Sequence, residues 1–257
     1  MSAPQDKPWS QIHEMLERRD SVNEIESLLD DLDPAELLHA VFSLAPDDQR
    51  ALLSILSPEK AASLIEDLPD AHVADLIEEM PATSSAPIVE EMASNHRVDV
   101  LAELDAADAE AIIAELDEED ANEVRELINY PSDQAGGLMM KEFAAYPMAR
   151  SVREVVEDIT SDKVDYEFLT VHYIYVVVKK KKLKGVIRLR DLVFADPNQT
   201  IGSIAKPALT VSPETNLEDL EQFFDDHDIA AVPVVDDKQS LLGIVRRRAL
   251  LEALTER

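Results

Sequence analysis

Tyr130-Pro-Ser-Asp-Gln-Ala-Gly-Gly-Leu-Met-Met140 lies near the middle of the 257-residue chain and separates two unlike halves. It contains Gly136 and Gly137, two of only five glycines in the sequence. Adjacent glycines let the backbone adopt a positive φ or approach another backbone closely. Because glycine is so scarce in this chain, we expect the pair to be required for local geometry and the stretch to mark a boundary between two domains.

The two halves differ in charge. The formal net charge is −30, and residues 1–130 contain 33 Asp and Glu against 7 Lys and Arg, a net of −26. Residues 131–257 contain 21 against 17, a net of −4. This balance argues against nucleic acid as a general partner and against anionic membrane surfaces. It suits a cation-binding protein, or an acidic surface that only confers solubility.

Residue content disfavours several classes of function. The chain has no cysteine, which excludes disulfides, thiolate metal sites and a cysteine nucleophile. Its start, MSAPQDKPW, lacks the apolar core of a signal peptide, and apolar runs such as residues 171–178 are far shorter than the ~20 residues that span a bilayer. The six histidines show no metal-ligand spacing, and no P-loop, nucleophile elbow or dinucleotide fingerprint occurs. We therefore expect a cytoplasmic protein that is not an enzyme and has no membrane-spanning segment.

The first half carries a twelve-residue repeat, preceded by a helix near residues 9–19. Each repeat position is followed within three residues by Pro, Asp, Ser or Asn, which are favoured at the start of a helix. Short helices of this kind are unstable alone, so the repeat predicts a stacked all-α array. The repeat positions are Leu32, Leu44, Leu56, Leu68, Met80, Met92, Leu104 and Leu116.

The second half contains two stretches that align without a gap at an offset of 58, residues 174–192 and 232–250. Each reads as a β-branched strand, a polar turn, a second strand through Gly185 or Gly243, and the start of a helix. An amphipathic helix precedes each stretch, near residues 151–159 and 216–224, with Ser151 and Thr215 as N-caps. The pattern predicts two copies of one α/β module.

These two copies resemble a tandem pair of CBS domains, a Bateman module. Together with the helical array and the linking stretch, residues 20–257 resemble the cytosolic part of the MgtE magnesium channel family. The resemblance implies a multi-domain α + α/β fold: an acidic right-handed superhelical N domain of short helices (1–130), the hinge (131–140), CBS 1 (139–198) and CBS 2 (199–257). It rests on Ala135-Gly-Gly-Leu-Met139, Tyr173-Ile-Tyr-Val-Val177, Leu189-Arg-Asp-Leu192 with Ala195-Asp-Pro197, and Leu242-Gly-Ile-Val245.

The resemblance also implies a function. In that family the N domain and the CBS pair act as an intracellular Mg²⁺ sensor, in which magnesium bridges carboxylates between the domains and the transmembrane pore shuts. A hard cation with oxygen ligands relieves the repulsion among clustered carboxylates. The implied cofactor is Mg²⁺, and the implied partners are a second copy bound through the CBS domains and a membrane magnesium channel domain.

By the resemblance, the metal positions of this chain are Asp99, Gly136, Glu214 and Asp226. The sequence departs from the family at Ser63 and Asn95, where carboxylates are expected, and at Arg246-Arg-Arg-Ala249, which replaces a Thr-Val-Asp-Asp run. Our hypothesis is that Arg248, with Arg246, forms an interdomain salt bridge in place of a bridging Mg²⁺.

CBS modules often bind adenine nucleotides through a Thr or Ser and an Asp in one short run. The first copy keeps the acid as Asp191 but has Arg188 for the Thr, and the second copy has Ala249 for the acid. An AMP or ATP site is therefore expected only at Asp191, whose alternative role is a helix N-cap. Two other functions stay open: a nucleotide sensor without a magnesium role, and a ligand-free scaffold whose acidic array binds a basic protein.

Two charged clusters have more than one interpretation. Lys179–Lys182 and Lys184 are either a solvated turn or a docking site for an acidic partner or phosphates, and the lack of interleaved aromatic residues does not favour nucleic acid. Asp225-Asp-His-Asp228 is either a solvated helix end or a cation site, since the helix dipole disfavours carboxylates at a C-terminus.

Overall fold

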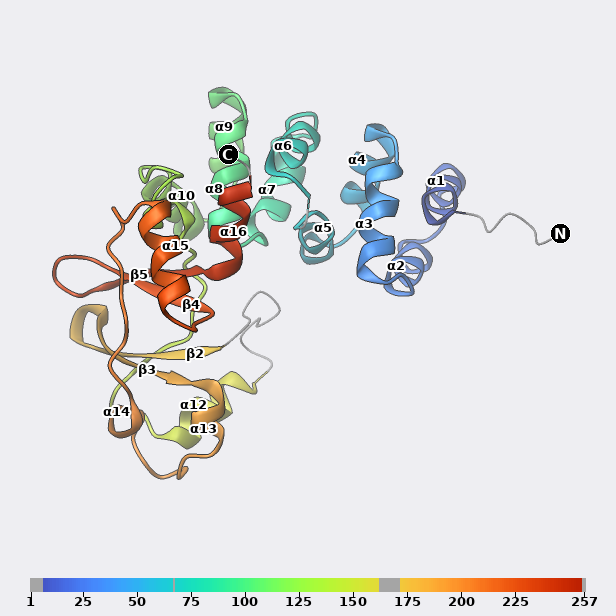
Figure 1. Ribbon diagram of the computed structural model, residues 1–257. Coiled ribbons are helices and arrows are strands. Elements are labelled where there is room, and N and C mark those ends of the chain that lie inside the picture. The colour runs from blue at the N-terminus through green and yellow to red at the C-terminus, as the bar shows by residue number, and fades with distance from the viewer. Residues whose placement is uncertain (1–6, 67, 162–171, 256–257) are drawn as a thin grey trace. The chain divides into compact units, whose positions relative to one another are not determined.

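The computed structural model describes residues 7–66, 68–161 and 172–255 (Figure 1). Its internal contacts divide the chain into two units. The first unit comprises residues 1–92 and 96–125, and the second comprises residues 93–95 and 126–257. Along the chain the main division falls between Arg125 and Glu126, ahead of the stretch from 131 to 140.

The first half of the chain is built from short helices (Figure 1). Alternate helices pack on one another, α1 on α3, α3 on α5, α5 on α7 and α7 on α9, as expected for a stacked repeat. The helices are α1 (Pro8–Arg18), α2 (Val22–Asp30), α3 (Pro34–Ser43), α4 (Pro46–Ile55), α5 (Pro58–Ile65), α6 (Asp70–Glu78), α7 (Ala82–Glu90), α8 (Ser94–Glu103), α9 (Ala106–Ile113) and α10 (Glu118–Leu127).

The predicted repeat is confirmed in both its ends and its core. Asp33 caps α3, accepting a hydrogen bond from Glu36 N while the Glu36 carboxylate accepts one from Asp33 N. The Ser57 hydroxyl caps α5 by accepting a hydrogen bond from Lys60 N, and Pro occupies the first helical position of both helices. The ladder residues from Leu44 to Leu116 are all buried, while Leu32 at the start is half-buried.

Arg97 on α8 is buried, with 4% of its side chain exposed, and joins three helices of the first unit. Its guanidinium donates to the backbone oxygens of Val89 (3.0 Å), Glu90 (2.6 Å) and Met92 (3.2 Å) at the end of α7. Nη1 also lies 2.5 Å from the Asp120 carboxylate on α10. A cation is favoured there because the last carbonyls of a helix lack intrahelical partners and carry the negative end of its dipole.

The second unit holds the two α/β copies. In the first, β1 pairs parallel with β2 and β2 antiparallel with β3; in the second, β4 pairs antiparallel with β5 and Val211 makes a parallel bridge to Val234 where a third strand would lie. The elements are α11 (Ala135–Leu138), β1 (Ala145–Pro147), α12 (Val152–Ile159), β2 (Tyr173–Val178), the 3-10 turn η1 (Lys179–Lys181), β3 (Lys182–Arg188), α13 (Leu189–Val193), α14 (Ile201–Ile204), α15 (Leu217–Asp226), β4 (Ala231–Val235), β5 (Leu241–Arg246) and α16 (Arg247–Thr255).

The two hairpins repeat each other in detail at the offset of 58. Strand register, bulge and turn geometry all recur at matching positions, so the predicted duplication is confirmed. The matching features are the pairs Tyr173 with Arg188 and Ala231 with Arg246, the bulges after Val176 and Val234, and the positive φ of Lys181 (55°) and Gln239 (65°).

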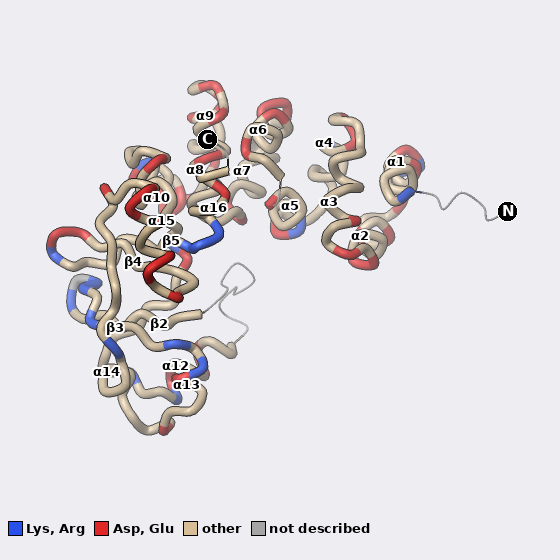
Figure 2. Tube along the Cα trace, in the orientation of Figure 1, with Lys and Arg blue, Asp and Glu red and all other residues tan. Residues whose placement is uncertain are grey.

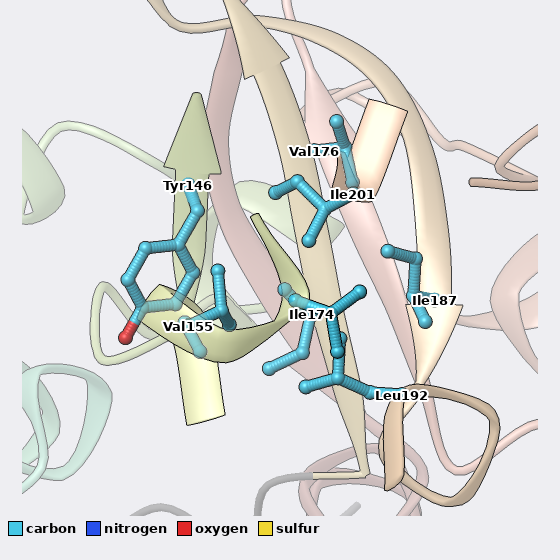
Figure 3. Close-up of a cluster of buried hydrophobic side chains, with 9 residues drawn as sticks. Tyr146, Val155, Ile174, Val176, Ile187, Leu192 and Ile201 are labelled. Carbon is cyan, nitrogen blue, oxygen red and sulfur yellow. The ribbon is translucent and has the colours of Figure 1, made fainter. Parts of the chain in front are cut away.

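The amphipathic helices cover their sheets as predicted. Figure 3 shows Val155 of α12 facing Ile174 of β2, with Ile187 of β3 and Leu192 of α13 in the same buried cluster. Ser151 caps α12 within a capping box. The predicted cap of α15 was wrong by one residue: Asn216, not Thr215, precedes the helix, because its side-chain oxygen reaches Asp219 N at 2.9 Å.

The segment that enters each copy pairs with the sheet of the other copy. Met140 and Ile244 exchange backbone hydrogen bonds of 2.9 and 3.0 Å, and Lys206 and Val186 exchange bonds of 2.8 and 3.0 Å. Gly243 and Gly185 make room for these crossings, because a Cβ atom would lie 2.8 Å from Met140 O and 2.5 Å from Lys206 O, respectively. The two copies therefore complete each other's sheets.

The stretch around Gly136 belongs to this interlocked unit. Ala135 N and Gly136 N donate to Thr215 O (2.7 Å) and Pro213 O (2.8 Å). Neither Gly136 nor Gly137 has a positive φ, so close approach is the reason for glycine. A Cβ on Gly137 would collide with the backbone oxygen of Pro131.

Candidate nucleotide and cation sites

Two adjoining clefts open between the α/β copies. The larger has a volume of about 840 Å³ and the smaller about 260 Å³, and they share Tyr173, Arg188 and Ile229 as lining residues. Arg188 ends β3, and Ile229 precedes β4, so both copies contribute walls. A volume of several hundred Å³ is typical of a small-molecule site.

Basic side chains gather at these clefts. Arg190 and Arg247 line the larger one, Lys206 lines the smaller one, and Arg188 lines both. Asp228 is the acidic residue of the larger lining. In a chain of net charge −30, this local excess of cations suits an anionic ligand such as a phosphate.

Asp191, the predicted nucleotide residue, lies beside the clefts on α13. Its carboxylate accepts a hydrogen bond from Lys206 Nζ at 3.0 Å, and Arg190 Nε is 3.7 Å away. The hydrogen bond from Lys206, together with the charges of Arg190 and Arg188, lowers the pKa of Asp191. The N-cap alternative was wrong, because Arg188 holds the cap position and Asp191 is the third residue of the helix.

The apolar walls are formed by aromatic and aliphatic side chains. Tyr173 lies in both linings, and its hydroxyl accepts a hydrogen bond from Ala230 N at 3.3 Å, which fixes the ring. Pro207 and Leu209 complete the smaller cleft, and Leu209 is 45% exposed.

The matching position of the second copy is filled by side chains. The crossing residues Lys206 and Met140 are 66 positions apart, and the same spacing relates Leu209 to Phe143. The Phe143 ring packs edge-on against Tyr175, with centroids 6.0 Å apart, in a cluster with Met140 and Ile244. Among the described residues, the two clefts therefore lie at the position of the first copy, and side chains occupy the matching position of the second.

The structure brings together two of the four predicted metal positions. Asp99 lies half-buried on α8 in the first unit and already has an interaction partner. Gly136 and Glu214 come together beside Tyr130: Gly136 binds Pro213, the residue before Glu214, and the Glu214 charge adds to the burial that raises the pKa of Tyr130.

Glu214 and Asp226 of one chain lie too far apart to share an ion. Glu214 lies just before α15 and accepts a hydrogen bond from the Ser212 hydroxyl, which lowers its pKa. Asp226 is the last of the ten residues of α15. A helix of that length spans about 15 Å, far more than two ligands of one Mg²⁺ can bridge.

Both halves of the chain match known proteins. A sequence model of the MgtE intracellular N domain matches residues 15–133, and one of the CBS domain matches residues 201–256. The crystal structure of the cytosolic domain of the Mg²⁺ channel MgtE in complex with ATP has a TM-score of 0.83 and 31% identity, and covers 95% of this chain and 99% of that chain. The chain belongs to the family of MgtE cytosolic domains.

Other relatives of the MgtE type agree. The crystal structure of the soluble part of a magnesium transporter has a TM-score of 0.86 and 29% identity, and covers 98% of both chains. The magnesium transporters MgtE of Thermus thermophilus and Enterococcus faecalis are 39% and 33% identical, over 51% and 52% of this chain. Each of these matches spans 29% of the relative's length. None of the helices described here has the length and apolarity needed to cross a membrane.

The MgtE N-type unit holds one acidic cluster that the sequence did not reveal. Glu78 of α6 meets Asp105, the N-cap residue of α9, and Asp108 within α9, with ligand atoms within 4.8 Å of one another, and all three residues are exposed. Within the described ranges this is the one group of three acidic or imidazole side chains close enough to share an ion, and it contains none of the predicted positions. Glu78 and Asp105 are 27 positions apart in the sequence, so motif rules based on short spacings do not detect the group.

The three arginines of the second CBS copy have different surroundings. Arg246 ends β5, and Arg247 begins α16 and donates to the backbone oxygen of Phe224 at the end of α15. Arg248 Nε lies 2.6 Å from the Glu252 carboxylate, one turn along α16. The proposed interdomain salt bridge from Arg246 and Arg248 stays a prediction.

Proposed function

We propose that this chain is the cytosolic regulatory module of an MgtE-type magnesium channel, and that it responds to Mg²⁺ and to an adenine nucleotide. The observation that carries the proposal is its near-complete match to an MgtE cytosolic domain solved with ATP, joined with a cationic cleft in its own fold. Regulation of a membrane channel domain, action at the cytoplasmic face and the absence of catalysis are parts of the same proposal.

The cleft residues suit the three parts of a nucleotide. Arg188, Arg190 and Lys206 would face the phosphates, because charge-assisted hydrogen bonds favour anions. Asp191, kept ionised by its neighbours, would accept hydrogen bonds from ribose hydroxyls. Tyr173 and Pro207 would flank the base.

The proposed stoichiometry is one nucleotide per chain. The second copy has Met140 where the first has Lys206, and Phe143 where the first has Leu209. It also has Ala249 at the position of Asp191. A nucleotide bound there would keep Arg246 and Arg248, which match Arg188 and Arg190, but it would lack the lysine and an acceptor for its ribose hydroxyls.

The proposed magnesium response rests on carboxylate density. The helical half carries a net charge of −26, and Mg²⁺ prefers carboxylate oxygens and retained waters. Asp99, Glu214 and Asp226, with the backbone oxygen of Gly136, remain our proposed ligands, and each would need further ligands from water or from elsewhere in the assembly. By this proposal Mg²⁺ favours closure of the N-type unit on the CBS pair.

A homodimer through the CBS domains belongs to the proposal as well. Val193 and Leu251 are 65% and 57% exposed, and they occupy matching positions of α13 and α16 at the offset of 58. Phe194, next to Val193, is 89% exposed. Large apolar side chains exposed at equivalent places of a duplicated fold favour a symmetric partner.

Calorimetric titration with ATP and AMP tests the nucleotide site. We expect one site per chain, and Asp191→Asn and Lys206→Gln each weaken binding about tenfold or more, the range for a lost charged hydrogen bond. Arg153→Gln, an exposed change outside both clefts, leaves affinity within twofold. Equal effects of the three variants would refute the assignment.

Thermal unfolding with Mg²⁺, Ca²⁺, AMP and ATP separates the alternatives. A ligand at 100 times its Kd stabilises by about 2.7 kcal/mol, so a real ligand raises Tm measurably. Small-angle scattering then follows closure: Arg248→Asp should make compactness depend more steeply on Mg²⁺. A protein whose Tm is unchanged by all four ligands would favour the scaffold alternative.

A further inference from the structure

The most basic stretch of the chain is the lysine turn, residues 179–184, which holds five lysines in six residues. It links β2 to β3 through η1. The side chain of Lys180 lies outside what the structure describes. The other four are exposed, and in the described part of the chain none of them has an ion-pair or hydrogen-bond partner. By contrast, Lys206 pairs with Asp191 at 3.0 Å.

The turn has a fixed shape. Leu183 packs against the buried cluster around Tyr175, and its N–H donates to Gln239 O at 2.9 Å. Because side chains alternate along a strand, Lys182 and Lys184 point away from the face that Leu183 buries. Lys181 adopts the left-handed region, with φ of 55°, which holds the turn tight. The lysines thus project from the end of a sheet to which Leu183 anchors the turn.

The equivalent turn of the second copy, residues 236–240, lies alongside. Lys182 and Ser240 form a β-bridge between the two turns. Asp236 Oδ1 accepts hydrogen bonds from Lys238 N (2.8 Å) and Ser240 N (2.7 Å), so this oxygen faces the backbone of its own turn. The charges of Asp237 and Lys238 offset each other. The paired turns therefore keep a positive face, and Figure 2 shows Lys and Arg gathered along the turn that leads into β3.

Several features indicate what this face binds. Neither cleft described above includes a residue of the lysine turn, so a ligand of those clefts does not account for its charge. The charges come from lysine, a compact point charge, rather than from arginine with its planar fork for specific partners. Attraction to an extended, loosely ordered anionic surface needs only such point charges.

We propose that the lysine turn binds the anionic phospholipid headgroups of a membrane surface. The relatives of this chain are parts of membrane transporters, so a bilayer is the nearest extended anion to such a module. This step rests on the part of the proposed function that places the chain beside a membrane. It needs neither the nucleotide nor the Mg²⁺ site.

The overall negative charge does not oppose a local contact of this kind. Charges farther away than the Debye length, about 8 Å at physiological ionic strength, are largely screened. The lysines would then be the part of the molecule that tolerates close approach to an anionic leaflet, while the acidic helices are repelled. The turn would therefore set which end of the module faces the membrane.

Vesicle flotation tests the proposal with the full chain. The vesicles contain either phosphatidylcholine alone or phosphatidylcholine with 30% phosphatidylserine, about the anionic content this attraction requires. EDTA is present, because Mg²⁺ could bridge acidic protein to acidic lipid, and no nucleotide is added. The matched variants are Lys182→Gln/Lys184→Gln and Arg150→Gln/Arg153→Gln, which remove the same charge from two places in the second unit.

We expect wild type to float only with phosphatidylserine vesicles and to lose binding as salt is raised. The lysine variant should bind about tenfold more weakly, and the arginine variant within twofold of wild type. Absence of wild-type binding, or equal losses in both variants, would overturn the proposal. So would displacement by 10 mM free phosphate, or tighter binding to polyglutamate than to the vesicles. None of these outcomes bears on Mg²⁺ or nucleotide binding.

Discussion

Replacing Arg97 with alanine should destabilise the N-type unit more than any exposed arginine change. The side chain is 4% exposed and serves three backbone oxygens at the end of α7 and the Asp120 carboxylate. Alanine leaves those acceptors in a site that excludes most water. The ties between α7, α8 and α10 are lost together.

The loss of unfolding free energy depends on the acceptor groups that remain without the guanidinium. Removing one partner of a buried, hydrogen-bonded charge costs about 3–5 kcal/mol. Asp120 is 28% exposed and regains water, which moves the expectation toward the middle of that range, about 4 kcal/mol. With a urea m-value of about 2.5 kcal/mol/M, the unfolding midpoint should fall by about 1.6 M.

Urea unfolding followed by far-UV circular dichroism measures this fall. The single tryptophan gives a second probe, since Trp9 lies on α1 and its ring contacts His39 at 5.0 Å. Stacked repeats can lose cooperativity, so the two probes report whether the array unfolds as one body. If the two unfolding transitions do not coincide, the urea midpoint should fall more in circular dichroism than in Trp9 fluorescence, because α8 is far along the array from α1.

Arg125→Ala is the matched control. Arg125 Nη2 lies 3.7 Å from Glu110, and its side chain is 51% exposed, so its loss should cost at most about 1 kcal/mol. Arg97→Lys keeps the charge but lacks the several N–H donors of the guanidinium, so its loss of stability should lie between those of Arg97→Ala and Arg125→Ala. If Arg97→Ala shifts the midpoint no more than Arg125→Ala does, the buried cation is not holding the three helices together.

Further expectations concern caps, association and pH. Asn216→Ala should cost about 1 kcal/mol in thermal or urea unfolding, and Thr215→Ala clearly less, since only Asn216 caps α15; the reverse order would contradict the cap assignment. Phe194→Ser with Leu251→Ser should turn a dimer into a monomer in light scattering, and an unchanged mass would remove these side chains from the interface. The lowered pKa of Asp191 means that its ion pair stabilises the fold above its ordinary pKa of 3.8 and is lost as pH falls through the lower folded value. The urea midpoints of wild type and Asp191→Asn should therefore converge as pH drops from 5 toward 3, and a constant difference would argue against the pair.

Local patterns were sufficient to predict most of the fold. The twelve-residue ladder specified helix starts and buried faces at once, because proline and short polar residues act on their own turn. The offset of 58 specified both hairpins down to the bulge. One cap was misplaced, because Thr215 and Asn216 are both good caps and only the backbone conformation selects between them.

The sites were less predictable because they depend on contacts distant in sequence. Lys206 lines a cleft only because its backbone forms a β-bridge to Val186, and no local sequence pattern predicts this bridge. Arg188 and Arg247 were visible in sequence as departures from a motif, and Arg190 as part of a matching one, but none of them as a cleft lining. Glu78 meets Asp105 only because the fold brings the end of α6 to the start of α9. The four metal positions inferred from resemblance still await a direct test.

The exchange of entering segments has a mechanical consequence. Residues 135–140 lead into the first CBS copy, yet their backbone bonds are to Pro213, Thr215 and Ile244 of the second. A pull arriving along the chain from the helical half would therefore load the copy that comes later in sequence. Neither copy could be cut out as an independent piece without leaving an open sheet edge. A force on this segment would therefore act on both CBS copies together, as would a ligand bound in the clefts between them.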